Sequence, residues 1–486
     1  MRISIENFGP IASASIDLRP LTIFIGPNNT GKSYAGLLLY ALFGSLGGSR
    51  GRRSVIEPLV RVMQEMVKDA RIETAIEGLK SSSLGLADVQ DLVRETGSSL
   101  RRCLSNAAEP WGEALGSELR YYFGVQTPSE LVRAGSGKAP LSIRVQPRPG
   151  AKSFVRYRIR KDSPEVEAAT HIPSLTEFTI PERFLSEVSL SSGSSTSLLT
   201  VQILQLVWFS LLDQLDVPVF SKETCYLPPS RSGLLQAWQG YVSLALDRAS
   251  SFVGIEPVQI PAFSGVTNDF LRTLVERIMN PPTGRRSQLP EASRILRQQL
   301  FRGDVEISKR RGSAAPEIVY DSASGAHVPI SRASSLVGEL APLALWMDHV
   351  LGPEDMLIMD EPEAHLHPEA QRIIARILVR LVNSGVRVLF TTHSSTLLHQ
   401  ISNHIVADAI PESALRKLGY GREDTLGASE VSVSLFAPGR SGTRVSPVSV
   451  SQEDGISENE FLRVAEMMGD ETYNLYSSYP VSGDHL

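Results

Sequence analysis

The sequence predicts an α/β fold in which a sheet of central parallel strands carries a phosphate-binding loop, with a mainly helical lobe inserted into the chain. Near the N-terminus an apolar run leads into a glycine-rich loop and then a helix. Late in the chain a second apolar run ends in two adjacent carboxylates. Between these two motifs apolar residues recur mostly at helical spacing, which favours helices for the inserted lobe.

The glycine-rich loop follows the apolar run Ile23–Ile25 and fits the pattern G-x-x-x-x-G-K-[ST] at every defined position. The glycines allow successive N–H groups to point inward as an anion-binding nest, and the following helix adds the positive end of its dipole. The lysine is a point charge for the β- and γ-phosphates, and the hydroxyl after it is a ligand for Mg²⁺. The residues expected to bind a nucleoside triphosphate are Gly26, Asn28, Asn29, Thr30, Gly31, Lys32 and Ser33.

The second apolar run, Met356–Met359, ends in Asp360 and Glu361. Such a run, flanked by turn residues, is typical of a central parallel strand whose two faces are both covered. Ligands of open α/β sheets lie at the carboxyl ends of the strands, so both carboxylates are expected beside the phosphate-binding loop. We therefore expect Asp360 to hold Mg²⁺ together with Ser33, and Glu361 to orient and deprotonate the attacking water.

A further apolar run, Val386–Phe390, leads into Thr391-Thr392-His393-Ser394. His393 again stands at a strand end, where it can hydrogen-bond the γ-phosphate. A lone histidine is more often structural, but its position two elements after the paired carboxylates favours a place in the same site.

Composition is ordinary for a globular protein, with 486 residues of which 42% are hydrophobic and 21% charged. A chain of this length suggests about two to three domains. The net charge of −5 argues against a surface coated in basic residues for non-specific nucleic-acid binding, although a local basic groove stays open. Two cysteines, Cys103 and Cys225, build no disulfide framework, which favours a reducing, cytoplasmic setting.

No membrane segment is expected. Residues 1–7 have no long apolar core, unlike a signal peptide. The most apolar later stretch, Leu198–Leu215, is interrupted by polar residues, whereas a bilayer span needs about 20 mostly apolar ones. A buried helix is the better interpretation of that stretch.

Local patterns predict the remaining elements. Residues that alternate between polar and apolar predict strands over Leu141–Val145, Phe154–Ile159, Val305–Lys309, Glu317–Tyr320, Val431–Phe436 and Arg444–Val450. Apolar residues at helical spacing predict helices over Val55–Leu79, Leu86–Leu104, Trp111–Phe123, Leu234–Ser250, Asn268–Met279, Ala292–Phe301 and Glu458–Tyr476.

Taken together, the motifs resemble the ATPase heads of the ABC type, in particular the SMC/RecF-like and OLD-like bacterial ATPases. The segments that carry the resemblance are Ile5–Pro10, Gly26–Ser33, Asp360–Pro368 and Thr392–Ser394. The resemblance implies a P-loop NTPase fold with a discontinuous head built from residues 1–50 and 325–486. Residues 51–324 are then a mainly helical insertion lobe with short strands.

The resemblance also implies that ATP and Mg²⁺ are sandwiched between two heads, so that the chain forms a homodimer or a higher homo-oligomer. Residues 334–339, here called the signature segment, would contact the γ-phosphate of the partner head in trans through Ser334, Ser335 and Gly338. Leu336 stands where the family has a glycine. Ser335, at a helix N-terminus, can equally be an N-cap.

In this family ATP binding closes two heads and hydrolysis reopens them, which implies a part in nucleic-acid repair or antiphage defence with a separate nuclease or toxin as effector. OLD-like nucleases carry a Toprim domain after the ATPase, and the residues after Ile405 lack its Glu and Asp-x-Asp clusters. Two alternatives stay open: a RecF-like repair ATPase that binds DNA directly, and a scaffold that binds ATP but scarcely turns it over. A basic groove for DNA would use Arg50, Arg52, Arg53, Arg156, Arg158, Arg160, Lys161 and Lys309–Arg311.

Three further residues have more than one interpretation. Arg231, after Pro228-Pro229, is either a ligand for phosphate or nucleic acid or a surface loop arginine. His365 and His367 have no cysteine or third histidine at ligand spacing, so no metal site is expected there. The resemblance instead implies that they lie where one head faces another.

Overall fold

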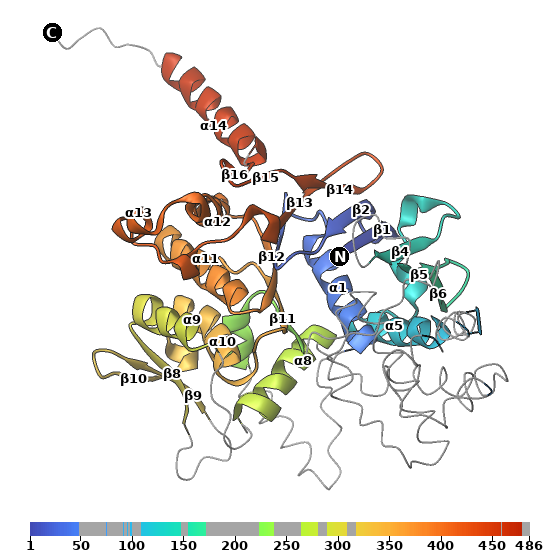
Figure 1. Cartoon of the computed structure of the whole chain (residues 1–486), viewed down its shortest axis with the longest axis horizontal. Helices are drawn as coiled ribbons and strands as arrows, with labels where there is room; N and C mark the ends of the chain where they lie inside the picture. The colour runs from blue at the N-terminus through green and yellow to red at the C-terminus, as the bar shows by residue number, and fades with distance from the viewer. Residues whose placement is uncertain are drawn as a thin grey trace.

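The computed structural model describes residues 1–47, 108–146, 154–171, 223–237, 264–279, 289–308, 317–457 and 459–478, together with positions 74, 91, 95, 98 and 99. These residues form an α/β structure on one large mixed sheet (Figure 1). The predicted fold class is thereby confirmed. The helices expected over Val55–Leu79, Leu86–Leu104 and Leu198–Leu215 lie wholly or largely outside the described residues, as do Arg50, Arg52, Arg53 and Lys309–Arg311.

The large sheet has the strand order β6-β5-β4-β1-β2-β14-β13-β3-β12-β11-β7 among the described residues. Its parallel part consists of β7 (Thr224–Leu227), β11 (Met356–Asp360), β12 (Arg387–Thr392), β3 (Leu21–Ile25) and β13 (Val431–Ala437). All residues of β3, β7 and β11 are buried, because helices and loops cover both faces. The loop-bearing strand β3 lies between β12 and β13 at the centre of this part.

The other part of the sheet is mainly antiparallel and joins through β14 (Thr443–Val448), which is antiparallel to β13 and parallel to β2. Its remaining strands are β2 (Ile11–Asp17), β1 (Arg2–Phe8), β4 (Leu141–Gln146), β5 (Phe154–Ile159) and β6 (Val166–His171). Buried and less buried residues alternate along β4 and β5, as expected for strands with one covered face.

Four strands of the large sheet come from the range 51–324 that the sequence assigns to an insertion lobe. Strands β4–β6 extend the sheet beyond β1, and β7 forms its opposite edge beside β11. The head's sheet therefore includes parts of that range. Alternation of polar and apolar residues along a strand shows that one face of the strand is buried, but it does not identify the neighbouring strand. From the sequence alone these strands are therefore placed in the lobe.

The sheet separates two hydrophobic cores. Along β3, Phe24 belongs to one core while Leu21, Ile23 and Ile25 belong to the other. Helices α1 (Lys32–Gly47) and α5 (Ala108–Phe123) pack in the first core. Helices α10 (Ser335–His349), α11 (Pro368–Asn383) and α12 (Ser395–Val406) pack in the second. The parallel strands are thus covered on both sides, and the strand ends remain as the place for ligands.

Smaller elements surround the two cores. Helix α8 (Gly265–Thr273) continues as the π-helical turn η6 (Leu274–Met279), and α9 (Pro290–Ile295) continues as η7 (Leu296–Phe301). A three-stranded antiparallel sheet consists of β8 (Gly303–Ser308), β9 (Glu317–Ser322) and β10 (His327–Pro329). The short 3₁₀ turns are η2 (Pro128–Leu131), η3 (Ala134–Ser136), η8 (Ile330–Arg332), η9 (Ala407–Ala409), η10 (Arg422–Asp424) and η11 (Ala428–Glu430).

Near the C-terminus, α13 (Glu412–Lys417) is followed by the two-stranded pair β15 (Val450–Ser451) and β16 (Gly455–Ile456). Helix α14 (Asn459–Ser477) extends away from the rest of the chain in Figure 1. Among the described helices, none combines the length and the apolar character that a membrane span requires.

Candidate nucleotide-binding site

The phosphate-binding loop connects β3 to α1 and depends on glycine at two positions. Gly26 has φ +135°, and a Cβ built there would lie 2.4 Å from the carbonyl oxygen of Phe436 on β13. Gly31 has φ +91°, and a Cβ there would lie 2.7 Å from the ring of Pro10 in the β1–β2 turn. Only glycine combines this backbone with such close neighbours. The loop conformation is therefore set by the strand and the hairpin beside it.

Lys32 is buried, with 5% of its surface exposed, and it folds back over the loop. Its ammonium nitrogen donates hydrogen bonds to the carbonyls of Gly26 and Pro27 at 2.9 and 2.8 Å. Thr30 Oγ1 also donates to the Pro27 carbonyl, at 2.8 Å. Burial lowers the pKa of Lys32 to about 8, while the nearby carboxylates of Glu361 and Asp360 oppose that shift. An incoming phosphate would replace the two carbonyls as partner of the ammonium group.

Asp360 ends β11 with its carboxylate buried among hydroxyl groups. Thr391 Oγ1 donates to its Oδ1 at 2.9 Å, and Tyr226 Oη donates to its Oδ2 from the adjacent strand β7. The Ser33 hydroxyl also hydrogen-bonds this carboxylate. Burial raises the pKa of Asp360 despite these donors, because removing a carboxylate from water disfavours its charged form.

Ser33 and Asp360 are a donor set that fits Mg²⁺. The ion prefers hard oxygen ligands and is commonly bound by one or two carboxylates together with substrate phosphates and water. A hydroxyl and a carboxylate already in contact at the end of the phosphate-binding loop supply the protein's share of such a site. Within the described ranges no group of three or more His, Cys, Asp and Glu could hold a metal ion by itself.

Glu361 follows Asp360 and has an uncommon left-handed backbone with φ +47°. Its N–H donates to the carbonyl and to the hydroxyl of Thr391, at 3.1 and 3.2 Å. This conformation brings its carboxylate to 3.8 Å from Nε2 of His393. Burial lowers the pKa of His393, and the charge of Lys32 lowers it further, so the imidazole is neutral near pH 7.

Glu363 holds the end of strand β12. Its Oε1 accepts hydrogen bonds from Thr392 Oγ1 at 2.6 Å and from the His393 N–H at 2.8 Å. Burial raises the pKa of Glu363. These two bonds direct Glu363 toward Thr392 and His393, whereas the Glu361 side chain is 42% exposed and accessible to water.

The expectation that Arg231 is a phosphate ligand or a surface arginine was wrong. Its side chain is completely buried and forms an ion pair with Glu339, with Nε 3.4 Å from Oε2. It also donates to the carbonyls of Asp360 and Glu361 at 2.8 and 3.1 Å. The proline turn before it directs the chain inward, an outcome that Pro228-Pro229 alone could not indicate.

The signature segment forms the start of α10. Ser334 is the N-cap, its hydroxyl accepting from the Val337 N–H at 3.4 Å, so the capping serine is Ser334 rather than Ser335. Ser334 and Ser335 are exposed. Gly338 is buried, and a Cβ there would lie 2.9 Å from Cβ of Ser232. Gly338 therefore serves the packing of α10 against the start of the helical segment 231–237 that follows β7.

His365 and His367 lie in the turn after Glu361, and both are exposed. His365 has φ +60°. His367 is the N-cap of α11, where its Nδ1 accepts a hydrogen bond from the Glu369 N–H at 3.3 Å. His367 thus has a structural part that its position in the sequence does not reveal.

Two residues at the site were not identified from the sequence. Thr391 is the register partner of Asp360, so the strand-end reasoning that selected His393 could also have selected it. Tyr226 lies in the short buried strand β7, opposite Ile358 of β11. From there its hydroxyl reaches the carboxylate of Asp360. Nothing in the sequence indicates that β7 neighbours β11, so Tyr226 could not have been predicted.

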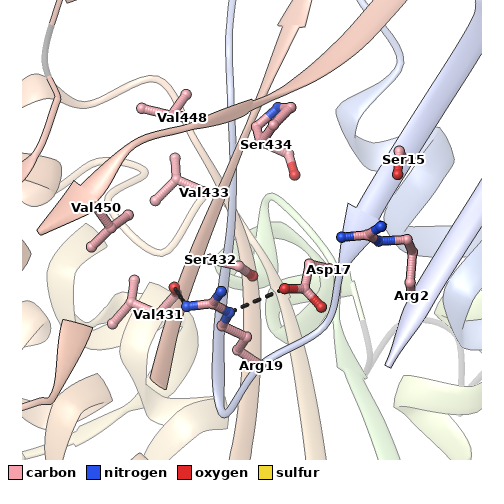
Figure 2. Close-up of a pocket in the computed structure, with 11 residues that line it drawn as sticks. Arg2, Ser15, Asp17, Arg19, Val431, Ser432, Val433, Ser434, Val448 and Val450 are labelled. Atoms are coloured by element: carbon pink, nitrogen blue, oxygen red, sulfur yellow. Dashed lines mark hydrogen bonds and ion pairs between the residues drawn. The ribbon is translucent and has the colours of Figure 1, made fainter. Parts of the chain in front are cut away.

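Figure 2 shows a cavity of about 260 Å³ that is separate from this site. It lies between Arg2, Ser15 and Asp17 on one side and strands β13 and β14 on the other. Arg19 at its edge pairs with Asp17 and donates to three carbonyls, those of Ala428, Ser429 and Val431. None of the predicted nucleotide-binding residues lines this cavity, and Arg19 is occupied in joining β2 to β13.

The described basic residues near β5 divide into two groups. Arg160 pairs with Glu167 at 3.2 Å, and Lys161 Nζ donates to the Ala134 carbonyl at 3.1 Å. Arg156 instead lies directly across from Arg144 on β4. Burial and the neighbouring Arg144 and Arg158 lower the pKa of Arg156.

Comparison with known proteins finds two separate parts of the chain that are similar to family models. Residues 1–83 match a family model described as "AAA ATPase domain". Residues 270–399 match a model described as "AAA domain, putative AbiEii toxin, Type IV TA system". Each match covers less than half of the chain. The first includes the phosphate-binding loop, and the second includes Asp360, Glu361 and His393.

A curated relative is the Nod factor export ATP-binding protein I of Cupriavidus metallidurans, which is 35% identical over 83 residues. The aligned part is 17% of this chain and 26% of that protein, so the chain spans about a quarter of the relative's length.

Three solved structures of SMC heads are similar at low identity. One, bound to the C-winged helix domain of ScpA, has a TM-score of 0.38 and 13% identity, covering 92% of this chain and 97% of that one. The SMC head domain from Thermotoga maritima has a TM-score of 0.35 and 10% identity, with 92% and 98% covered. A head with an extended coiled coil, bound to a ScpA domain derived from Pyrococcus furiosus, has a TM-score of 0.38 and 9% identity, with 96% and 98% covered.

The geometry and the two family matches agree on the same residues. The glycine-rich loop lies within the first match, and the ends of β11 and β12 lie within the second. They meet at the carboxyl ends of the parallel strands of the large sheet. The chain is an α/β P-loop protein, and two separate parts of it, residues 1–83 and 270–399, are similar to family models of ATPase domains.

Proposed function

We propose that the protein is a Mg²⁺-dependent ATPase whose ATP-bound heads associate in pairs. The observation that carries the proposal is the convergence of Lys32 and Ser33 with Asp360, Glu361 and His393 at the ends of neighbouring parallel strands. These five side chains supply the groups that phosphoryl transfer to water requires: a positive charge, a hydroxyl, two carboxylates and an imidazole.

In the proposed reaction, water attacks the γ-phosphorus, the bond from that phosphorus to the β,γ-bridging oxygen breaks, and ADP and phosphate form. Glu361 accepts the proton of the attacking water, which its exposed carboxylate can contact. Lys32 stabilises the negative charge that develops on the phosphates, and neutral His393 can donate its N–H to the γ-phosphate. Ser33 and Asp360 would hold Mg²⁺, which neutralises phosphate charge when it is bound.

Head association follows from the same proposal. The N-terminal turn of α10 presents Ser334 and Ser335 to solvent, and the free N–H groups of a helix N-terminus favour a phosphate. In a pair of heads this turn would face the γ-phosphate bound by the partner. The family description that mentions a putative AbiEii toxin supports a defence-related process, with a separate nuclease or toxin as effector.

The variant Glu361→Gln tests the ATPase proposal. Glutamine retains the shape but cannot accept a proton, so ATP hydrolysis should slow by about 10²–10⁴-fold while ATP affinity stays within a few-fold. Sedimentation with Mg-ATP should then show a larger species than the nucleotide-free protein. The matched control is Glu369→Gln, an exposed glutamate in the first turn of α11 that should leave the rate unchanged.

Three results would contradict the proposal. Wild-type hydrolysis rates in Glu361→Gln would place the base elsewhere, with Glu363 the next candidate. Absence of turnover in the wild-type protein, with nucleic acid or partner present, would favour the scaffold that binds ATP without hydrolysing it. A monomer in saturating Mg-ATP would exclude association of heads.

A second candidate function, direct binding of nucleic acid, is favoured by one feature of β4 and β5. Arg144 and Arg156 lie opposite each other and both guanidinium groups face the ring of Phe154, at 3.8 and 5.0 Å from its centroid. His171 stacks on the same ring, with the centroids 4.9 Å apart. Two like charges across a strand pair are unfavourable unless an anion lies between them. The carboxylate of Glu6 acts on Arg156, and a phosphate backbone would supply a further anion to the pair.

The double variant Arg144→Gln/Arg156→Gln tests this candidate. Its DNA and RNA affinity should fall, and the dependence of affinity on salt concentration should become less steep by about one to two ions, because each lost arginine removes a phosphate contact. Arg422→Gln, which removes an exposed arginine on η10, is the matched control. Equal salt dependence in all three proteins would exclude this face as a nucleic-acid site.

A further inference from the structure

The buried Arg231 lies between two parts of the candidate site that are distant in sequence. On one side its guanidinium donates to the main-chain carbonyls of Asp360 and Glu361, at 2.8 and 3.1 Å. On the other side its Nε donates to the Glu339 carbonyl at 3.0 Å and pairs with the Glu339 carboxylate. A fourth carbonyl, that of Pro228, accepts from the guanidinium at 3.1 Å and ties it to the turn just before Arg231.

Glu339 is as completely buried as Arg231, and both of its oxygens are occupied. Oε2 accepts the Arg231 N–H at 3.1 Å, and Oε1 accepts the Ser232 hydroxyl at 2.7 Å. Gly338 allows this contact, since a Cβ there would lie 2.9 Å from Ser232. The inner side of the signature segment is therefore attached to the helical segment 231–237, which begins at Arg231.

The hydrogen bond to the carbonyl of Glu361 is important because it helps to hold an unfavourable backbone conformation at this residue. A left-handed φ of +47° is unfavourable for a residue with a Cβ, so it persists only where the surroundings hold it. Thr391 holds the N–H of Glu361 and Arg231 holds its carbonyl oxygen. Arginine suits this position because its planar group donates several hydrogen bonds in fixed directions, which the point charge of a lysine cannot do.

We propose that Arg231 is a positioning residue for Glu361, and that its buried pair with Glu339 ties the signature segment to the same position. This inference rests on the proposed function, in which Glu361 accepts the proton from water. Displacement of α10 at its N-terminus, where a second head would contact it, then reaches Glu361 through Glu339 and Arg231. The site and the signature segment act as one unit.

A double-mutant cycle on ATP hydrolysis tests the first part. Arg231→Lys should lower kcat by about 10- to 100-fold, since a small misplacement of a reacting group costs that much, while KM changes little. In the Glu361→Gln background the same substitution should lower kcat by less than about twofold, because the group that it positions is already disabled. Equal losses in both backgrounds would mean that Arg231 acts only on general stability, and would overturn the inference.

Amide hydrogen exchange without nucleotide tests the second part. Arg231→Lys and Glu339→Gln should both speed exchange in residues 357–366, because Glu339 holds Arg231 and Arg231 holds the carbonyls of Asp360 and Glu361. Exchange of β3, residues 21–25, serves as the internal reference for global opening. The matched control is Arg297→Lys, which disturbs an ion pair with Asp348 at the other end of α10.

The outcomes separate this inference from the proposed function. If Glu339→Gln leaves exchange in residues 357–366 unchanged, or if Arg297→Lys speeds it equally, the coupling is excluded whether or not ATP is hydrolysed. If the wild-type protein fails to hydrolyse ATP but both site variants speed exchange locally, the proposed function fails while the structural coupling stands.

Discussion

Tyr226 donates a hydrogen bond to Oδ2 of Asp360 across the paired strands β7 and β11. Burial raises the pKa of Tyr226 well above its ordinary value, and the charge of Asp360 raises it further, so the hydroxyl remains a donor. The carboxylate that would hold Mg²⁺ is therefore oriented by a residue at the edge of the sheet.

Replacing Tyr226 by phenylalanine should lower the free energy of unfolding of the apo protein and increase the stabilisation that Mg-nucleotide gives. The loss of a donor to a buried carboxylate should cost about 1–3 kcal/mol in the free energy of unfolding. Mg²⁺ with a non-hydrolysable ATP analogue should restore part of that loss by occupying Asp360. Thermal unfolding with and without the ligand measures both quantities.

Tyr122→Phe is the control for that experiment, because Tyr122 donates to the buried carboxylate of Asp269 at 2.8 Å, outside the candidate site. It should lose stability without any change in the gain from Mg-nucleotide. An equal gain in both variants would show that Tyr226 does not orient a metal ligand.

The affinity for ATP should fall as the pH rises above about 8. The pKa of Lys32 is about 8 in the absence of ligand, and phosphates favour its charged form, so binding takes up a proton above that pH. Affinity should drop by about tenfold per pH unit until the pKa of the complex is reached. Calorimetry with a non-hydrolysable analogue between pH 7 and 9.5 measures the slope.

Lys32→Arg should bind the analogue more weakly at pH 7, but with little change up to pH 9.5, because a guanidinium stays charged throughout. Lys32→Ala should lose tight binding altogether. A slope in Lys32→Arg as steep as in the wild-type protein would assign the titration to another group.

Gly26→Ala should abolish nucleotide binding and lower the free energy of unfolding by about 1–3 kcal/mol. A Cβ at φ +135° is strained, and it would also meet the Phe436 carbonyl at 2.4 Å, so the loop or β13 must move. Gly233→Ala is the control, since no atom lies within 4 Å of a Cβ there and its φ is ordinary. Chemical denaturation and calorimetry on both variants decide the matter, and full binding by Gly26→Ala would contradict the loop geometry.

Stability should also decline between about pH 6.5 and pH 4 because of His404. Burial lowers the pKa of this histidine to about 4, while Nδ1 contacts the Asp424 carbonyl and Gln400 contacts Nε2. The unfolded chain binds the proton more readily, so unfolding becomes easier as the pH falls through this window. The loss should be about 2 kcal/mol between pH 7 and pH 5.

The charged groups around His404 are Asp424, Arg376 and Arg380, and they remain in place in the variant His404→Asn. Urea unfolding at both pH values should therefore show a smaller difference in the variant than in the wild-type protein. Equal differences would assign the pH dependence to the carboxylates.

The sequence was sufficient to predict the elements that carry the strand-end residues, and insufficient to predict the residues that hold them in place. Asp360 and His393 follow apolar runs, and such runs mark central parallel strands whose ends meet at one edge. Arg231 and Glu339 are 108 residues apart, and each looks like a surface residue in its local context. Their pairing depends on which strand neighbours β11, information that no local pattern contains.

The position of β3 has a consequence for synthesis of the chain. The strand that bears the phosphate-binding loop is completed within the first residues, yet both of its neighbours, β12 and β13, come from residues 387–437. A polypeptide leaving the ribosome exposes an unpaired, mostly apolar strand during most of its elongation, and pairing over such a separation is slow. The nascent chain therefore cannot complete the sheet around β3 until β13 has emerged, and β3 is the segment that a chaperone would have to shield until then.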